Sequence, residues 1–587
     1  MASNSKRLVS PCLWITTILS QRRCLMPVTA LTADIDMIIT NAKVLTMHRG
    51  QTRAQAVAIA GGKIVSLGAR AHVEAMAHDG TKIIDAGGRS LLPGFFESHL
   101  HLGLGGAELA HLNLSGVEGF DALKTAFARY GAQNPDRSLL MAQSAHYAML
   151  DHPMSRHDLD KMMPNRPIAM TAHDHHTVWA NTAALKAAGL LNGAVTPKGH
   201  EVVMGPDGLA TGELREFEAF APIIALGGEQ RLNLGIATGQ EPNPWPAEAE
   251  RAIDRAKFLA GLKHCARNGI TSMVNMDGNR YTLELLRELE REGNLLARVK
   301  VPFHFKPDMG PEQLIRAQDM THDFDDDWLS SGFVKMFMDG VIDSKTAFML
   351  NDYPDQAGHR SEPLFAAREF NEIATKIDAM GLQISVHAIG DGAVQTTING
   401  YEAAQLVNGK RDSRHRIEHI ELIDRRDIAR LGALGIVASL QPPHPPGAMD
   451  FDLEPSLSVI GKARWADAFL WKTLADHGAP IAYASDWPVA DVSVMRGLQA
   501  SLTRRPYDAT CRNECLSRYE SIHAYTAGGA WASHRETVTG QLKSGLAADM
   551  VLIDGDIEVI SAEHLGQTPV ALTIAGGRIT YDAKEQD

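Results

Sequence analysis

Two histidines two residues apart give the strongest chemical signal in the sequence. His99 and His101 close the run Pro93-Gly-Phe-Phe-Glu-Ser-His-Leu-His. Residues i and i+2 of a β-strand face the same side, so both imidazoles can hold one cation. The chain has 25 histidines, and an isolated pair of this kind is more often solvated than ligating. The remaining ligand-type residues therefore decide the interpretation.

Three more such residues stand at the ends of other short β-rich runs. His387 ends Ile-Ser-Val-His, His419 ends Arg-Ile-Glu-His, and Asp486 follows Tyr-Ala-Ser. In a parallel α/β barrel the carboxyl ends of the strands meet at one face, where active sites lie. Four imidazoles and a carboxylate at that face suit a divalent transition metal such as zinc. We therefore predict a metal centre made by His99, His101, His387, His419 and Asp486.

Lys335 lies inside another such run, Gly332-Phe-Val-Lys-Met-Phe-Met-Asp-Gly. A buried free ammonium is costly and would repel a cation. Two interpretations follow. Carbon dioxide can convert the lysine to a carbamate, an anionic ligand able to bridge two ions, or the lysine pairs with Asp339 or another carboxylate.

The sequence pattern in the middle of the chain predicts the strands and helices that position these residues. β-rich runs alternate with amphipathic helical stretches there, which predicts a parallel α/β barrel. The eight runs are 91–102, 269–276, 297–305, 332–340, 382–390, 414–420, 436–442 and 481–488. The expected helices include 255–267, 282–291, 367–380, 426–434 and 465–477. Residues 105–268 are too many for one strand-to-helix connection and predict an insertion, able to act as a lid over the site.

The two ends of the chain have a different character. Residues 34–90 and 538–587 carry short β-rich runs separated by Gly-Gly and Asn turns, so we expect one composite β-sandwich domain built from both ends. The barrel then occupies 91–537. Residues 1–33 are expected to be a disordered leader of a cytoplasmic protein. Export directed by the apolar segment 8–19 is the alternative, because Lys6 and Arg7 precede it.

Composition excludes several classes of protein. The 587 residues are 44% hydrophobic and 22% charged, which is ordinary for a globular chain. A net charge of −13 disfavours nucleic acid as a partner. Five scattered cysteines fit a reducing compartment. No apolar run reaches the roughly 18 residues that cross a bilayer, so we expect no membrane partner. The expected partner is a small-molecule substrate.

Together these residues resemble the amidohydrolase superfamily. Val334-Lys-Met-Phe-Met-Asp-Gly, His387-Ala-Ile-Gly-Asp-Gly-Ala, Gln441-Pro-Pro-His and Ser485-Asp-Trp-Pro-Val are similar to its family 3 branch, which includes N-substituted formamide deformylases, and the resemblance runs from about 36 to 581. It implies a (β/α)8 barrel with the composite sandwich, and a homodimer is compatible with it. The implied ligands are His99, His101, Lys335, His387, His419 and Asp486. They would hold zinc, either two ions bridged by carboxylated Lys335 or one ion.

One position departs from the family pattern. The family usually has Asp-Ser-His-x-His, whereas this chain has Glu97-Ser-His99-Leu-His101. Glu97 is outside the implied ligand set, so we expect it to contact the ligands and not the metal.

The expected reaction is hydrolysis of a C–N bond, of the amide or formamide type, in a small organic substrate. A bound metal lowers the pKa of water toward about 7, and Asp486 would act first as general base and then as general acid. The same site can also serve hydrolysis of esters, lactones or carbamates, deamination, or a metal-assisted lyase step. A non-catalytic binding protein is the remaining alternative. The candidate substrate contacts are His175, His176, Asn181, His444 and Trp487.

Overall fold

The structure of the chain is a computed structural model that describes residues 34–197 and 199–585. The predicted leader and its apolar segment lie outside these residues. The fold is α/β, and its middle part holds two sheets in which every neighbouring pair of strands is parallel. One sheet has the order β18 (Leu329–Ser330), β16 (Arg298–Lys300), β15 (Ile270–Asn275), β8 (Phe95–Leu100). The other has the order β17 (Phe303–His304), β19 (Phe333–Phe337), β20 (Gln383–Ala388), β21 (Arg416–His419), β22 (Val437–Leu440), β23 (Ile481–Tyr483).

Backbone hydrogen bonds link the two parallel sheets at one edge. After β23, the Asp486 amide donates to the His99 carbonyl at 2.9 Å, and the His101 amide donates to the Trp487 carbonyl at 2.7 Å. The predicted third run divides into β16 and β17, which belong to different sheets. Each of the eight predicted runs contains at least one of these strands.

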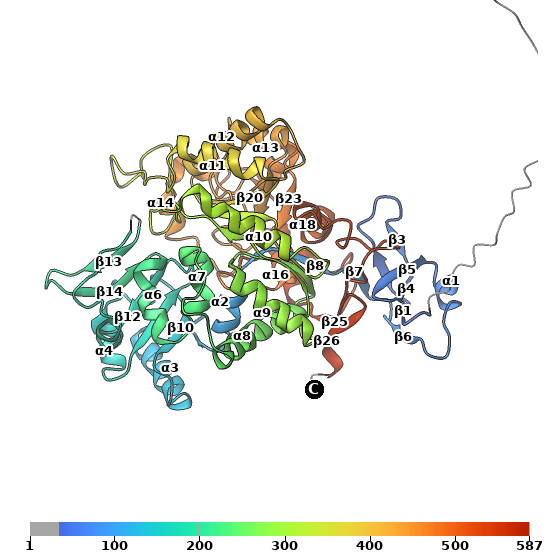
Figure 1. Cartoon of the computed structure of the whole chain (residues 1–587), viewed down its shortest axis with the longest axis horizontal. Helices are drawn as coiled ribbons and strands as arrows, with labels where there is room; N and C mark the ends of the chain where they lie inside the picture. The colour runs from blue at the N-terminus through green and yellow to red at the C-terminus, as the bar shows by residue number, and fades with distance from the viewer. Residues whose placement is uncertain (1–33, 198, 586–587) are drawn as a thin grey trace, which may run out of the picture.

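Helices cover the outside of the parallel strands (Figure 1). They are α8 (Glu248–Arg267), α9 (Arg280–Arg291), α10 (Ile315–Asp323), α11 (Ala367–Ala379), α12 (Asp391–Asn408), α13 (Ile428–Leu434), α15 (Trp471–Asp476) and α16 (Val494–Thr503). α9 is typical: the Asn279 side chain caps its first turn by accepting from the Thr282 amide, and Leu285, Leu286 and Leu289 are buried along one face.

Two further predicted elements are interrupted in the structure. The predicted strand 91–102 divides at Gly94 into β7 (Ser90–Pro93) and β8, because a Cβ at Gly94 would lie 2.1 Å from Thr271 Oγ1 and the chain passes too close to β15 for any side chain. The predicted helix 465–477 is a 3-10 turn, Lys462–Asp467, followed by α15. Phe469, with φ +52°, separates the two.

Both ends of the chain enter one six-stranded sheet. Its order is β26 (Arg578–Asp582), β25 (Val570–Ala575), β24 (Met550–Ile553), β7, β2 (Lys43–Leu45), β3 (Arg53–Ala54). A four-stranded sheet of β5 (Lys63–Gly68), β4 (Ala56–Ala60), β1 (Met37–Thr40) and β6 (Lys82–Asp85) packs against it. The shared apolar core includes Ile39 and Val57 from one sheet and Leu552 and Ile574 from the other.

Residues between β8 and β15 form a further sheet of their own. Its order is β13 (Glu201–Met204), β14 (Ala210–Arg215), β12 (Thr177–Ala180), β11 (Ile168–Ala172), β10 (Leu140–Ala145), β9 (Leu112–Asn113). Figure 1 shows this sheet and β1–β6 on opposite sides of the parallel strands. None of the helices in 34–197 and 199–585 combines the length and apolarity that a bilayer crossing requires.

Candidate metal centre

Three predicted ligands converge at the carboxyl ends of β8 and β23. His99 Nε2 lies 3.2 Å and His101 Nε2 lies 3.1 Å from Asp486 Oδ1. All three side chains are buried. Asp486 Oδ1 accepts no hydrogen bond within the described chain. A buried carboxylate oxygen without a donor, facing two imidazole nitrogens, is what a site for a cation requires, so the residues fit a metal.

Two carboxylates orient the imidazoles of this group. His99 Nδ1 contacts Glu418 Oε2 at 2.7 Å, and His101 Nδ1 contacts Asp277 Oδ1 at 2.7 Å. With Nδ1 donating to a carboxylate, each ring directs Nε2 toward Asp486, the arrangement that tunes metal-binding histidines. Burial opposes the charged form of His101, but Asp277 and Asp486 raise its pKa to about 10. A cation at this position would take the place of that proton.

The sequence analysis missed Glu418 and Asp277, although both had a signal. Asp277 stands two residues after the end of β15, at the face of the sheet where the other ligands stand. Glu418 precedes His419 on β21, where Arg416 Nε donates to it at 2.8 Å. Burial alone would raise the pKa of Glu418. The charge of Arg416 and the hydrogen bond from His99 hold it well below its ordinary value, so the carboxylate is an anion.

His387 and His419 lie beside the first group. The centroid of the His419 ring is 5.1 Å from that of His99 and 4.5 Å from that of His387. Burial lowers the pKa of both His387 and His419 well below the ordinary value. The rings are therefore neutral at physiological pH, the form in which imidazole binds a metal.

Lys335 lies on β19 and is fully buried near these rings. Its Nζ has no hydrogen-bond partner among the residues that the structure describes and lies 4.5 Å from the centroid of the Phe337 ring. Pairing with Asp339, one of the two interpretations above, is not observed. The Asp339 carboxylate instead accepts from the amides of Phe348, Ile389 and Gly390. Burial lowers the pKa of Lys335 to about 8, which enlarges the fraction of free amine that can react with carbon dioxide.

Glu97 supports the Asp486 loop. Its Oε1 accepts from the Ser485 amide at 2.8 Å and from the His99 amide at 3.4 Å. Burial raises the pKa of Glu97 to about 8, so the carboxyl is mainly protonated at neutral pH. This agrees with a side chain that contacts the ligand segments and not the metal.

The backbone is strained at two of the ligand positions and at a residue next to one of them, where the φ angles are positive. His419 has φ +79°, Ile420 has φ +48° and Asp486 has φ +63°. Non-glycine residues in this region cost about 1–3 kcal/mol each and cluster at functional sites. At Asp486 the amide hydrogen bond to the His99 carbonyl fixes the turn.

The group lies at one end of a cavity of about 640 Å³. Of the predicted substrate contacts, His175, His176 and His444 line this cavity. Asn181 and Trp487 are not among the residues that line it. Asn181 is buried and caps α5 (Thr182–Ala187), with Oδ1 accepting from the Ala184 amide at 2.8 Å. Trp487 packs over Gly105 and against the ring of His264.

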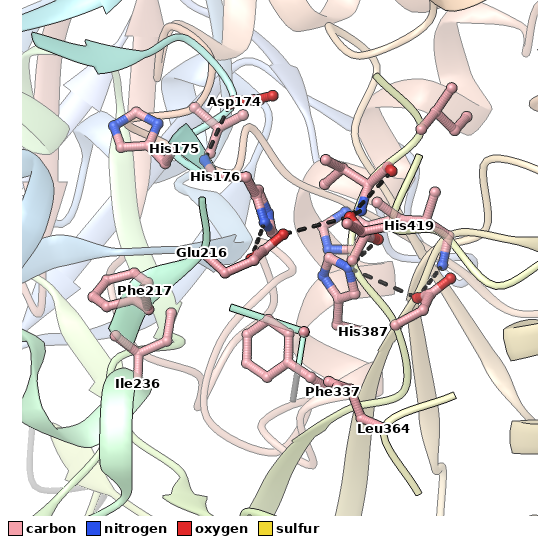
Figure 2. A pocket seen from close by; sticks show the side chains of 18 of the residues that line it. Asp174, His175, His176, Glu216, Phe217, Ile236, Phe337, Leu364, His387 and His419 are labelled. Atoms are coloured by element: carbon pink, nitrogen blue, oxygen red, sulfur yellow. Dashed lines mark hydrogen bonds and ion pairs between the residues drawn. The ribbon is translucent and has the colours of Figure 1, made fainter. Parts of the chain in front are cut away.

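The three histidines that line the cavity have different partners. His175 Nε2 contacts Glu108 at 2.9 Å. His176 Nδ1 contacts Glu216 Oε2 at 2.8 Å, and its ring centroid lies 6.1 Å from that of His387 (Figure 2). Burial opposes the charged form of His176, but Glu216 raises its pKa to about 9, so His176 is a proton donor at neutral pH.

His444 has a second possible role that the sequence analysis did not assign. Its ring lies 6.0 Å from that of His419 in a stacked arrangement, and its Nε2 lies 3.9 Å from Asp486 Oδ2. Ligand atoms of His419, His444 and Asp486 lie within 4.8 Å of one another. His444 Nε2 is buried without a hydrogen-bond partner in the described residues, so it can serve either a metal or a substrate oxygen.

Replacing Asp277 by alanine is expected to weaken metal binding by about 10–100-fold, because the His101 ring loses the acceptor that orients it. Competition between the protein and a chelating dye measures this affinity. Asp319→Ala, which removes an exposed carboxylate on α10, should leave it unchanged. Equal affinities of Asp277→Ala and the parent would mean that Asp277 does not support a metal ligand.

Most of the chain is similar to known proteins. A model described as "Amidohydrolase family" matches residues 82–581. The chain is 27% identical over 547 residues to the putative amidohydrolase YtcJ of Bacillus subtilis (strain 168), covering 92% of this chain and 98% of the relative. It is 23% identical over 582 residues to the N-substituted formamide deformylase of Arthrobacter pascens, covering 93% and 98%.

Solved structures show the same fold. An uncharacterized metal-dependent hydrolase from Pyrococcus horikoshii OT3 superimposes with a TM-score of 0.70 at 21% identity, covering 90% of this chain and 99% of that one. The corresponding protein from Pyrococcus furiosus gives a TM-score of 0.66 at 23% identity, covering 89% and 99%.

Proposed function

Because this chain belongs to the amidohydrolase family, we propose that it is a metal-dependent hydrolase that cleaves a C–N bond of the amide or formamide type in a small organic substrate. The observation that carries the proposal is the unpartnered Asp486 Oδ1 facing His99 Nε2 and His101 Nε2 at the end of the cavity. The likeness to a formamide deformylase favours a C–N bond over the ester and lactone alternatives.

We infer that His99, His101, Lys335, His387, His419 and Asp486 would hold zinc, as two ions bridged by carboxylated Lys335. A bound metal would activate water and polarise the substrate carbonyl. Asp486 is suited to take a proton from the attacking water and return it to the departing amine. Burial raises its pKa, but the neighbouring imidazoles of His99 and His101 outweigh burial, hold the pKa of Asp486 well below its ordinary value and keep it ionised.

We also infer the domain arrangement. The hydrogen bonds between the segment after β23 and the end of β8 support a closed (β/α)8 barrel in 91–537. The shared core of the two outer sheets supports a composite β-sandwich of 34–90 and 538–587. His176 reaches the cavity from the 105–268 insertion, which supports a role for that insertion as part of the active-site wall.

Metal content and hydrolysis measured together test the proposal. We expect about two zinc ions per chain, release of amine from a panel of N-substituted formamides and amides, and loss of that activity on chelation with recovery on adding zinc. Turnover of esters or lactones without any amide turnover would favour the second candidate reaction class. Folded protein that takes up no metal in the presence of bicarbonate would contradict the hydrolase proposal.

The dependence of kcat/KM on pH is expected to show the deprotonation of His176. Since Glu216 raises the pKa of His176 to about 9, a donor role predicts that kcat/KM falls as pH rises through about 9. Glu216→Gln removes the charge that raises this pKa, so the falling limb should move to lower pH. Glu213→Gln, which alters an ion pair with Arg215 on the same strand, is the control. An unmoved limb in Glu216→Gln would exclude His176 as the donor.

A further inference from the structure

A lysine ammonium without a partner lines the cavity. Lys306 follows β17 in a turn closed by the Met309 amide, which donates to the Lys306 carbonyl at 3.0 Å. Within the described residues its Nζ makes neither a hydrogen bond nor an ion pair. The contact recorded for it is the face of Phe337, whose ring centroid lies 5.0 Å away.

The surroundings of Lys306 are largely apolar. Figure 2 shows Phe217, Ile236, Phe337 and Leu364 gathered on the side of the cavity next to Glu216, and these residues line the same cavity as Lys306. Burial lowers the pKa of Lys306 to about 8, while the charges of Glu218, Asp308 and Glu216 partly oppose that effect. None of these carboxylates pairs with it, so a mostly protonated ammonium remains in the wall without a counter-ion among the residues that the structure describes.

Three of the carboxyl groups that line the cavity accept hydrogen bonds from protein donors. Asp343 accepts from Ser456 Oγ at 2.6 Å, and Asp174 accepts from Tyr147 and from the His176 amide. Asp339 accepts from three backbone amides. The contrast with Lys306 matters because its side chain is partly exposed in the cavity wall, where a ligand that supplies the opposite charge can reach it.

We propose that Lys306 binds a carboxylate of the substrate, so that the substrate is an amide carrying a carboxylate a short chain away from the scissile C–N bond. This deepens the proposed hydrolase function and rests on it. Phe337 is close to both of the positions that such a molecule would contact. The centroid of its ring lies 4.9 Å from that of His387 and 5.0 Å from Lys306 Nζ. A short acyl or alkyl chain lying along Phe337 would therefore reach both the imidazole cluster and the ammonium.

Calorimetric titration of protein as purified, with ligands that differ only at one end, tests this proposal. The probes are the monoamide of glutaric acid, which has one carboxylate, and glutaric diamide, which has none. We expect the parent to bind the monoamide about 10–100-fold more tightly, the size of a charge-assisted hydrogen bond. Lys306→Met should abolish that preference, Lys306→Arg should keep most of it, and Lys124→Met, at an exposed lysine of α3 (Phe120–Gln133), should leave it unchanged.

Each outcome either supports or overturns the proposed carboxylate site at Lys306. A preference that survives in Lys306→Met, or a folded parent that binds neither probe or both equally, would overturn the proposal. Lys306→Gln gives a second neutral variant, and circular dichroism verifies folding of each. The metal content of the same samples separates the two proposals. Folded protein that takes up no zinc in the presence of bicarbonate but still shows the Lys306-dependent preference would refute the hydrolase and keep the carboxylate site. Metal-loaded, active protein without the preference would do the reverse.

Discussion

Replacing Asp486 by asparagine is expected to lower kcat/KM for an amide substrate by about 10²–10⁴-fold, the usual contribution of a positioned general acid–base group. Asparagine keeps the shape of the side chain and an oxygen that can face His99 and His101, but it cannot accept and return a proton. KM should change less than kcat, because the loss affects proton transfer and not the cavity wall. Steady-state kinetics with matched metal content per chain measure both parameters.

The matched control is Asp491→Asn, which removes an exposed carboxylate a few residues further along the same segment, where it pairs with Arg496. This variant should retain parental kinetics. If Asp486→Asn keeps its metal and also keeps more than a tenth of the parental kcat, Asp486 is a ligand only, and another group such as His176 or His444 must move the proton.

The parallel strands could be predicted from the sequence because most of them lie in short β-rich runs that a polar residue ends or closely follows. That signal located His387 on β20 and His419 on β21 at the ends of their runs. The same reasoning cannot detect where tertiary contacts divide a run. Gly94 separates β7 from β8 because Thr271 of a distant segment occupies the space of a side chain, and no local pattern records that contact.

The candidate site shows a similar division. His99 and His101 carry a spacing that is visible in the sequence, whereas Asp277 and Glu418 are two among 70 acidic residues, and only the fold brings them to the imidazoles at 2.7 Å. Asn181 illustrates the opposite error. An asparagine followed by Thr-Ala-Ala-Leu has the pattern of a helix N-cap, and the structure places it in that role, so a local signal was available and pointed to capping.

Lys335→Met is expected to change metal binding and the stability of the metal-free protein in opposite directions. Loss of the lysine removes the proposed bridging ligand, so bound zinc should fall well below the parental content. The metal-free variant should nevertheless be more stable than the metal-free parent. Burial lowers the pKa of Lys335 from 10.5 to about 8, a difference that corresponds to about 3 kcal/mol against folding at neutral pH, and methionine fills similar volume without the charge.

The sign of the pH dependence makes this prediction specific. The folded protein holds the Lys335 proton less tightly than the unfolded chain, so the cost of the ammonium is fully present below about pH 8 and disappears as pH rises from about 8 to 10.5. The stability gained by Lys335→Met should therefore be largest near neutral pH and shrink toward pH 10. Urea unfolding of chelator-treated parent and variant at several pH values measures it, with Lys376→Met, at a partly exposed lysine of α11, as the control. Two outcomes would contradict the proposal that Lys335 is a metal ligand whose burial destabilises the metal-free protein. One is a variant that keeps two zinc ions, and the other is a metal-free variant that is less stable than the metal-free parent at every pH.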